Sequence, residues 1–187
     1  MILPKIFPKT YDTKDIICFV ILLGANDSNE PESPKGQYVP IEEYKQNLID
    51  MVSYLEQIGI GKNKIILMTP GVYHHDEYVK SCKLLNKDEP IKNNLTVCKY
   101  AQACVDAAKT CEVDVLNLFE LFSKQKDSKQ LLCDGLHFSK LGSELVFENL
   151  WPFIEQKVKD SGNTELGMNF PIYSDIDIAN PEKSLLN

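Results

Sequence analysis

The feature that most constrains the fold is an uninterrupted apolar run near the start of the chain. Residues 16–23 read Ile-Ile-Cys-Phe-Val-Ile-Leu-Leu, without a charge or a proline. Most of these side chains are β-branched or aromatic, which is typical of a strand buried on both faces in a parallel sheet. Even extended to Ala25, the run has about half the ~20 residues that a membrane span requires. The run therefore predicts a strand, and we expect no transmembrane segment.

Strands and helices alternate along the rest of the chain, which predicts an α/β fold with a parallel sheet. In such sheets, ligands bind beyond the carboxyl ends of the strands. Pro152 predicts a kink or a restart in the last helix, and Trp151 beside it is expected to anchor packing. The expected elements after the first strand are a helix over 41–58 that Pro40 opens and Gly59 ends, a strand over 64–69, a short helix or loop over 74–83, a helix with an apolar stripe at Leu95, Cys98, Ala101, Val105 and Ala108, a strand over 113–118, and a helix capped by Ser139 with a stripe at Leu141, Leu145, Val146, Leu150 and Phe153.

Composition excludes several classes of function. The 187 residues suffice for one domain, and 43% of them are hydrophobic. A net charge of −7 without a basic cluster argues against nucleic acid as a partner. The six cysteines form no Cys-x-x-Cys pair and have no zinc-ligand spacing, so we expect free, mostly buried thiols and no metal. Because no signal peptide opens the chain, we expect a reducing, cytoplasmic location.

Asp134 and His137 are the first candidates for catalysis. The carboxylate precedes the imidazole by three residues, just before the last predicted helix. A tight turn can place this carboxylate on one ring nitrogen and leave the other to accept a proton from a hydroxyl. A histidine in front of a helix is more often a capping or packing residue, and Asp-x-x-His also arises by chance. The spacing alone therefore leaves both interpretations open.

Asn26 follows the first predicted strand in the stretch Gly24-Ala25-Asn26-Asp27. An Asn at this place can donate its amide to a developing oxyanion, although an Asx turn that closes the strand is the more ordinary role. We expect Gly24 to allow a sharp turn and Asp27 to hold the loop by accepting backbone N–H bonds. The adjacent histidines, at 74 and 75, are expected at the surface.

Several motifs are absent. The chain has no Gly-x-Ser-x-Gly elbow, so no serine stands in a recognisable nucleophile setting. It also lacks both glycine-rich phosphate loops, which disfavours a nucleotide or phosphate binder.

Four blocks together resemble the SGNH (GDSL-type) hydrolases, and within them the isoamyl acetate-hydrolysing esterase branch. The blocks are Gly24-Ala25-Asn26-Asp27-Ser28, Pro40-Ile41-Glu42-Glu43-Tyr44, Asp134-Gly135-Leu136-His137-Phe138-Ser139 and Asn149-Leu150-Trp151-Pro152, and residues 181–186 fit the branch as well. The resemblance covers nearly the whole chain. It implies a flavodoxin-like three-layer α/β/α fold and hydrolysis of small, short-chain esters without a metal or other cofactor. It further implies that His137 is the general base, that Asp134 orients it, and that Asn26 is one of three oxyanion donors.

Two blocks of that family have no match, namely the Gly-Asp-Ser nucleophile after the first strand and a glycine after the second. Residues 1–4 resemble the end of the helix that follows the second strand. We therefore expect an SGNH hydrolase domain over 1–160 that lacks its first two strands, followed by an extended tail over 161–187. The strand at 16–23 would then have one unpaired edge, through which we expect self-association. Either the chain is an esterase by descent that lacks its nucleophile, or it is an inactive short form that acts as a binding or regulatory module.

Overall fold

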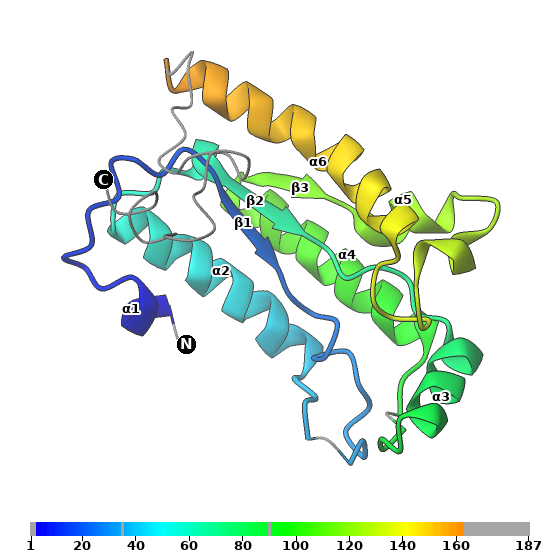
Figure 1. Cartoon of the computed structure of the whole chain (residues 1–187). Coiled ribbons are helices and arrows are strands. Elements are labelled where there is room, and N and C mark those ends of the chain that lie inside the picture. The colour runs from blue at the N-terminus through cyan, green and yellow to red at the C-terminus, as the bar shows by residue number, and fades with distance from the viewer. Residues whose placement is uncertain (1–2, 35, 90, 163–187) are drawn as a thin grey trace, which may run out of the picture.

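Three short parallel strands form the centre of this computed structural model, which describes residues 3–34, 36–89 and 91–162 (Figure 1). The strands are β1 (Phe19–Leu22), β2 (Ile65–Met68) and β3 (Asp114–Leu116), in the spatial order β1-β2-β3. Phe19 lies opposite Ile65, and Ile66 lies opposite Asp114. The parallel sheet confirms the predicted α/β class.

Helices cover both faces of the sheet and make the fold three-layered. The long helices α2 (Ile41–Gln57) and α4 (Asn94–Cys111) lie on one face, and α6 (Lys140–Asp160) lies on the other (Figure 1). Short elements complete the described chain: α1 (Leu3–Ile6), α3 (His75–Leu84), α5 (Leu118–Ser123) and the 3-10 turns η1 (Lys62–Lys64) and η2 (Ser128–Leu131).

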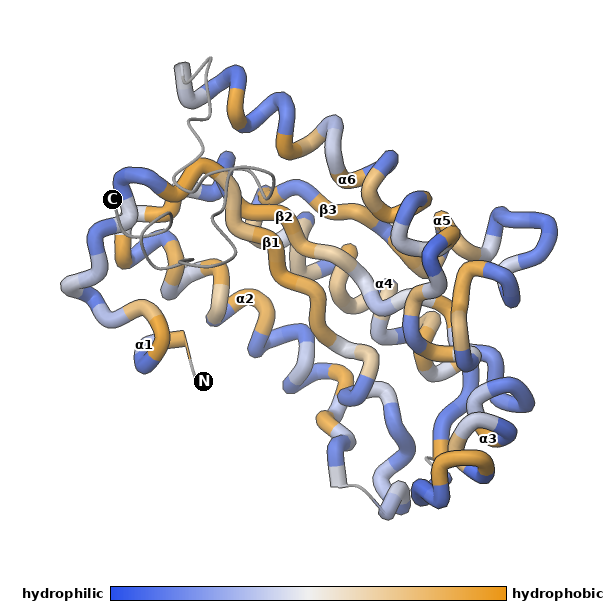
Figure 2. The backbone as a smooth tube through the Cα atoms, in the orientation of Figure 1, coloured by the Kyte–Doolittle hydropathy of each residue, from blue (hydrophilic) through white to orange (hydrophobic). Residues whose placement is uncertain are grey.

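Each helical face encloses its own hydrophobic cluster. On the α2 and α4 side, side chains such as Leu48, Leu55 and Leu67 are fully buried. On the α6 side, Ile66, Met68 and Leu116 form the buried floor under the helix. The strands form the continuous hydrophobic centre of the chain in Figure 2. The sheet therefore offers a rigid base for residues placed at its edges.

Sequence signals at helix ends are confirmed, whereas the restart that was one of the two outcomes predicted for the proline inside α6 does not occur. The α2 helix ends just before Gly59, whose φ is +94°, and Ser139 caps α6 by accepting the Gly142 N–H at 3.1 Å. The α6 helix continues through Pro152 without a restart. A proline removes one backbone hydrogen bond, and the packing of Phe153 and its apolar neighbours on the sheet holds the helix together.

The predicted stripe on α4 is confirmed at Ala101 and Ala108 and is wrong at Leu95 and Cys98. Leu95 is 78% exposed and Cys98 is exposed, while the buried face carries Val97, Tyr100, Ala101, Ala103, Cys104, Ala107, Ala108 and Cys111. Each residue turns a helix by about 100°, so a shift of one or two positions moves a side chain to another face.

The cysteines are free, as expected, but Cys98 and Cys133 are exposed rather than buried. Trp151 is 43% exposed and stacks on Phe147 at 5.7 Å, so it is no inward anchor.

The first strand is shorter than predicted and is buried on one face only. Among the described residues β1 pairs with β2 alone, and its other edge has no partner strand. Ile21 points into the α2 and α4 cluster, whereas Val20 and Leu22 are exposed. Among the residues that the structure describes, the α6 cluster includes side chains of β2 and β3 but none of β1.

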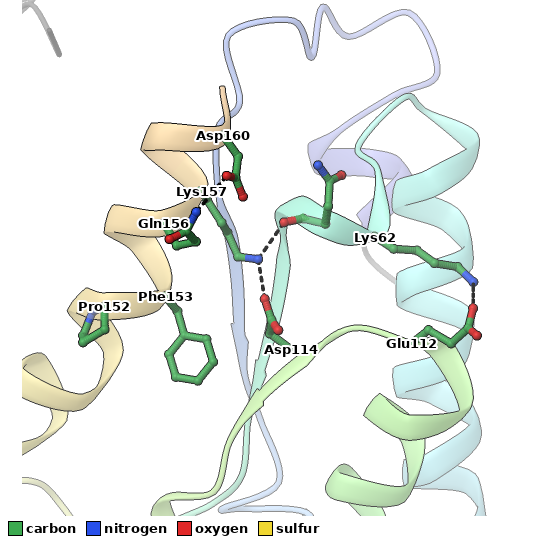
Figure 3. Close-up of a pocket in the computed structure, with 9 residues that line it drawn as sticks. Lys62, Glu112, Asp114, Pro152, Phe153, Gln156, Lys157 and Asp160 are labelled. Atoms are coloured by element: carbon green, nitrogen blue, oxygen red, sulfur yellow. Dashed lines mark hydrogen bonds and ion pairs between the residues drawn. The ribbon is translucent and has the colours of Figure 1, made fainter. Parts of the chain in front are cut away.

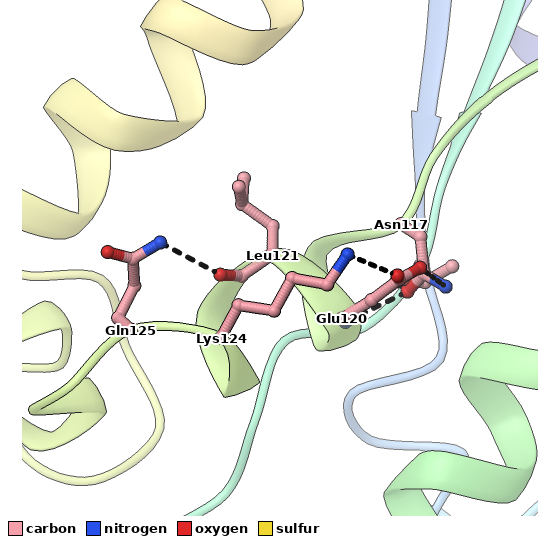
Figure 4. Close-up of polar contacts among 6 residues, drawn as sticks. Asn117, Glu120, Leu121, Lys124 and Gln125 are labelled. Carbon is pink, nitrogen blue, oxygen red and sulfur yellow. Dashed lines mark hydrogen bonds and ion pairs between the residues drawn. The ribbon is translucent and has the colours of Figure 1, made fainter.

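Two polar clusters fix elements to the sheet. Lys157 of α6 is 6% exposed, and its Nζ lies 2.5 Å from an Asp114 carboxylate oxygen and 2.6 Å from the Asn63 carbonyl (Figure 3). This contact joins the end of α6 to the start of β3. At the opposite edge, Asn117 accepts the Glu120 N–H at 3.1 Å and so caps α5, and Glu120 pairs with Lys124 (Figure 4).

No helix in the described part of the chain is both long and apolar enough to cross a membrane.

Candidate active site

The predicted site residues meet at the carboxyl edge of the sheet. A cavity of about 340 Å³ lies beyond β1 and β2, and both Asn26 and His137 line it. The remaining walls are mostly apolar, formed by Leu22, Ala25, Pro70, Gly71, Val72, Tyr73, Lys92, Val97, Leu136 and Phe138. Residues more than a hundred positions apart in sequence thus share one cavity.

A tight turn brings Asp134 onto His137. The Cys133 N–H donates to the His137 carbonyl at 2.8 Å and closes the turn. One carboxylate oxygen of Asp134 accepts the backbone N–H groups of Leu136 at 2.9 Å and His137 at 2.8 Å. Gly135 has a φ of +90°, and a Cβ there would lie 2.5 Å from the His74 carbonyl oxygen. Glycine is therefore required at this position.

The other carboxylate oxygen orients the imidazole. His137 Nδ1 lies 2.7 Å from Asp134 Oδ2, and the His137 side chain is 67% exposed. Burial raises the pKa of Asp134, but the hydrogen bonds from His137 and Leu136 outweigh it, so the net pKa lies below its usual value. A charged carboxylate on Nδ1 leaves Nε2 as the nitrogen able to accept a proton.

Asn26 presents its side chain at the cavity. Its backbone carbonyl accepts the Asn29 N–H at 3.1 Å, and its amide makes no hydrogen bond within the described residues. The amide is therefore not consumed in an Asx turn. Asp27 holds its loop differently from the prediction, because its backbone carbonyl, and not its carboxylate, accepts the Val39 N–H at 3.2 Å.

Gly24 lets the chain turn beneath the site. Its φ is +108°, and a Cβ there would lie 2.7 Å from the Tyr44 hydroxyl oxygen. That hydroxyl donates to the Leu23 carbonyl at 3.1 Å, and burial raises the pKa of Tyr44 strongly. The contact fixes the end of β1 against α2.

Sequence reasoning missed Lys92 and Tyr73. Lys92 is buried, yet its Nζ donates to the Ala25 carbonyl beside Asn26. Tyr73 is buried below it, and burial raises the pKa of the phenol to about 12. Lys92 stands among many charged residues in a polar stretch, so nothing in its sequence context distinguishes it.

Within the described residues, His74 hydrogen-bonds a serine but does not form a Ser-His-Asp triad. His74 Nε2 lies 3.0 Å from Ser128 Oγ, and the His74 N–H donates to the Gly135 carbonyl at 2.9 Å. His74 is thus partly buried rather than a surface residue, while His75 is exposed. No carboxylate hydrogen-bonds the ring of His74 in the described part of the chain. Over the same residues, no group of three or more His, Cys, Asp or Glu side chains forms a candidate metal site.

Sequence relatives cover the whole chain. The isoamyl acetate-hydrolyzing esterase 1 homologs of Rattus norvegicus and Homo sapiens are 39% and 37% identical to it, and each alignment spans 100% of this chain and 73% of the relative. A GDSL esterase/lipase of Arabidopsis thaliana is 32% identical over 88% of this chain and 68% of its own length.

Solved structures show the same fold. The lipase/acylhydrolase from Enterococcus faecalis superposes with a TM-score of 0.56 at 21% identity, and the match spans 80% of this chain and 63% of that structure. A family model described as GDSL-like Lipase/Acylhydrolase matches residues 8–150. Together with the relatives above, this match shows that the chain belongs to the GDSL-like lipase and acylhydrolase family.

Proposed function

We propose that this chain provides the proton-transfer half of a serine esterase site. In this proposal His137 is the general base, Asp134 orients and charges it, and Asn26 donates to the oxyanion. The observation that carries the proposal is the 2.7 Å contact between His137 Nδ1 and Asp134 at a cavity that Asn26 also lines. Membership of an acylhydrolase family supports the same reaction class.

The chemistry follows from these positions. His137 Nε2 accepts the proton of a serine hydroxyl as the serine oxygen attacks the ester carbonyl. The charge on the tetrahedral oxygen is met by the Asn26 amide, and the Asp134 carboxylate stabilises the imidazolium. The imidazolium then gives its proton to the departing alkoxide. A water molecule, activated by the same nitrogen, releases the acid from the acyl-enzyme.

The cavity favours small esters. Its walls are mostly apolar and its volume is about 340 Å³, which suits a short acyl group and a short alcohol. Two of the relatives are named as homologs of an isoamyl acetate-hydrolyzing esterase. We therefore propose short-chain carboxylic esters of that kind as substrates, with no metal or other cofactor in the reaction.

The nucleophile is the missing part. Within the described residues, no serine hydroxyl forms a hydrogen bond to the His137 ring. We therefore expect hydrolysis to require a Gly-Asp-Ser segment that this sequence does not contain. Removal of the nucleophile alone costs about 10⁶ in kcat in a serine protease.

The experiment compares two proteins on a short acyl ester. The 187-residue chain should show no turnover above background, and the same chain preceded by a family segment with Gly-Asp-Ser should hydrolyse the ester. His137→Ala in the longer protein should abolish that hydrolysis. Robust turnover by the 187-residue chain that disappears with His137→Ala would contradict the proposal, because another serine would then serve.

A binding or regulatory module is the second candidate. It is favoured by the contact between Asp134 and His137, to whose ring no serine hydroxyl of the described residues is hydrogen-bonded. A stable, monodisperse 187-residue protein that stays inactive with the added segment would favour this alternative over an esterase.

A further inference from the structure

Lys92 is a buried cation at the edge of the proposed site. It lies between α3 and α4, is 5% exposed, and forms part of the wall shared with Asn26 and His137. Its Nζ lies 5.6 Å from the centre of the Tyr73 ring. Removing an ammonium group from water is costly unless strong partners receive it. The groups that receive the Lys92 ammonium therefore indicate what this residue does in the fold.

One of these groups is the backbone next to the proposed oxyanion donor. Lys92 Nζ donates to the Ala25 carbonyl, and the buried Ser28 hydroxyl donates to the same oxygen at 3.1 Å. A carbonyl oxygen has two lone pairs, so both are used here. The Ala25 carbonyl and the Asn26 N–H belong to one planar peptide group. Holding this oxygen therefore fixes the plane of the peptide group that carries the Asn26 backbone nitrogen, and so restricts how Asn26 can turn.

Other contacts join the same two segments farther from Asn26. The Glu30 N–H donates to the Ile91 carbonyl at 2.7 Å, and the Glu30 carboxylate accepts from Asn93 at 2.9 Å and from Thr96 at 2.8 Å. These bonds attach the loop after β1 to the start of α4. They do not touch the peptide group that carries Asn26, so Lys92 has a distinct place among them.

We propose that Lys92 is the positioning residue for the Asn26 amide, acting through the Ala25 carbonyl. The proposal rests on the assignment of Asn26 as an oxyanion donor. It predicts that loss of the Lys92 ammonium lets the peptide between residues 25 and 26 rotate. Transition-state stabilisation should then fall, while ground-state binding of the ester changes little.

The first experiment uses the 187-residue chain and needs no activity. Hydrogen exchange of the Ser28 and Asn29 amides, which bond to the Gly24 and Asn26 carbonyls, should be about tenfold faster or more in Lys92→Met, as expected for a lost hydrogen bond to a charged group. Thr96→Val is the matched control, because it removes a bond between the same segments away from Asn26 and should leave these two amides unchanged. Equal acceleration in both variants, or none in Lys92→Met, would overturn the proposal.

The second experiment is a double-mutant cycle in the protein that carries the Gly-Asp-Ser segment. Lys92→Met should lower kcat about tenfold or more, bounded by the roughly 10²–10³ of one lost oxyanion donor, with KM little changed, and Lys92→Arg should restore part of the rate. In an Asn26→Ala background the same change should cost less than about twofold, because Lys92 acts through Asn26. An equal loss in both backgrounds would mean that Lys92 acts on the substrate directly.

If Lys92→Met does not fold, Ser28→Ala provides a second test of whether bonds to the Ala25 carbonyl position Asn26. It removes the other donor to the Ala25 carbonyl and should change exchange and kcat in the same direction. No hydrolysis by any variant would refute the esterase proposal, while the exchange measurement would still decide whether Lys92 holds the loop.

Discussion

At the residue scale, loss of the Asp134 carboxylate and loss of the Asn26 amide should lower kcat to different extents. In the protein with a nucleophile, Asp134→Asn should lower kcat by up to about 10⁴, the effect of the same change in a serine protease triad. Asn26→Ala should cost about 10²–10³, the value of one oxyanion donor. Steady-state kinetics on a short ester measures both, with KM little changed. A silent Asn26→Ala would refute the oxyanion role of that residue.

The carboxylate of Asp134 should also make stability depend on pH. Its pKa in the folded chain lies below the ordinary value of 3.8, so the unfolded chain takes up a proton first as the pH falls. The stabilisation is fully present above the unfolded pKa and is lost as the pH falls through the folded pKa. Urea unfolding of the chain and of Asp134→Asn should therefore give a gap that is constant above about pH 5 and shrinks below it. A gap that does not change with pH would contradict this account.

At the element scale, the first turn of α6 is locked onto the segment before the dyad. A Cβ at Gly142 would lie 2.1 Å from the Leu131 carbonyl oxygen, which is backbone and can move little. Gly142→Ala should therefore destabilise the chain by about 1–3 kcal/mol or more. The exposed neighbour is the control, since Ser143→Ala should stay within about 0.5 kcal/mol. Thermal or urea unfolding of both variants is the measurement, and equal stability of the two would exclude the clash.

Local signals predicted the order of the helices and strands, whereas burial depends on contacts between residues far apart in the chain. Pro40, Gly59 and Ser139 marked helix ends because caps and breakers act within a few residues. The stripe on α4 was right at Ala101 and Ala108 and wrong at Leu95 and Cys98, because only the approach of α2 decides which face of the helix is buried.

The site divides in the same way. The turn from Asp134 to His137 is local, so the spacing already allowed the contact between carboxylate and ring, although it left the role of that contact open. Lys92 could not be found, because its contact with the Ala25 carbonyl joins residues 67 positions apart. A lysine that will be buried cannot be distinguished in the sequence from a solvated lysine, because only the fold decides which of the two it is.

At the scale of the whole molecule, the uncovered edge of β1 should promote association. Val20 and Leu22 are exposed beside an edge without a partner strand in the described chain, a template for pairing with a second copy. We expect oligomers during purification, relieved by Val20→Lys. Leu95→Lys, on the outer side of α4, adds the same charge elsewhere and should not relieve them. Light scattering over a concentration series measures the effect, and a monomeric unmodified chain would contradict it.

The closed turn around the dyad also has a consequence for folding order. Asp134 and His137 are three residues apart, so bringing them together closes a very short loop and loses little chain entropy. Asn26 reaches the same cavity only when β1 and β2 have paired and the start of α4 has docked. Contacts between residues far apart in the chain close large loops, so they cost more chain entropy than the turn does. Heat or denaturant should therefore separate the oxyanion donor from the base while the base still holds its carboxylate.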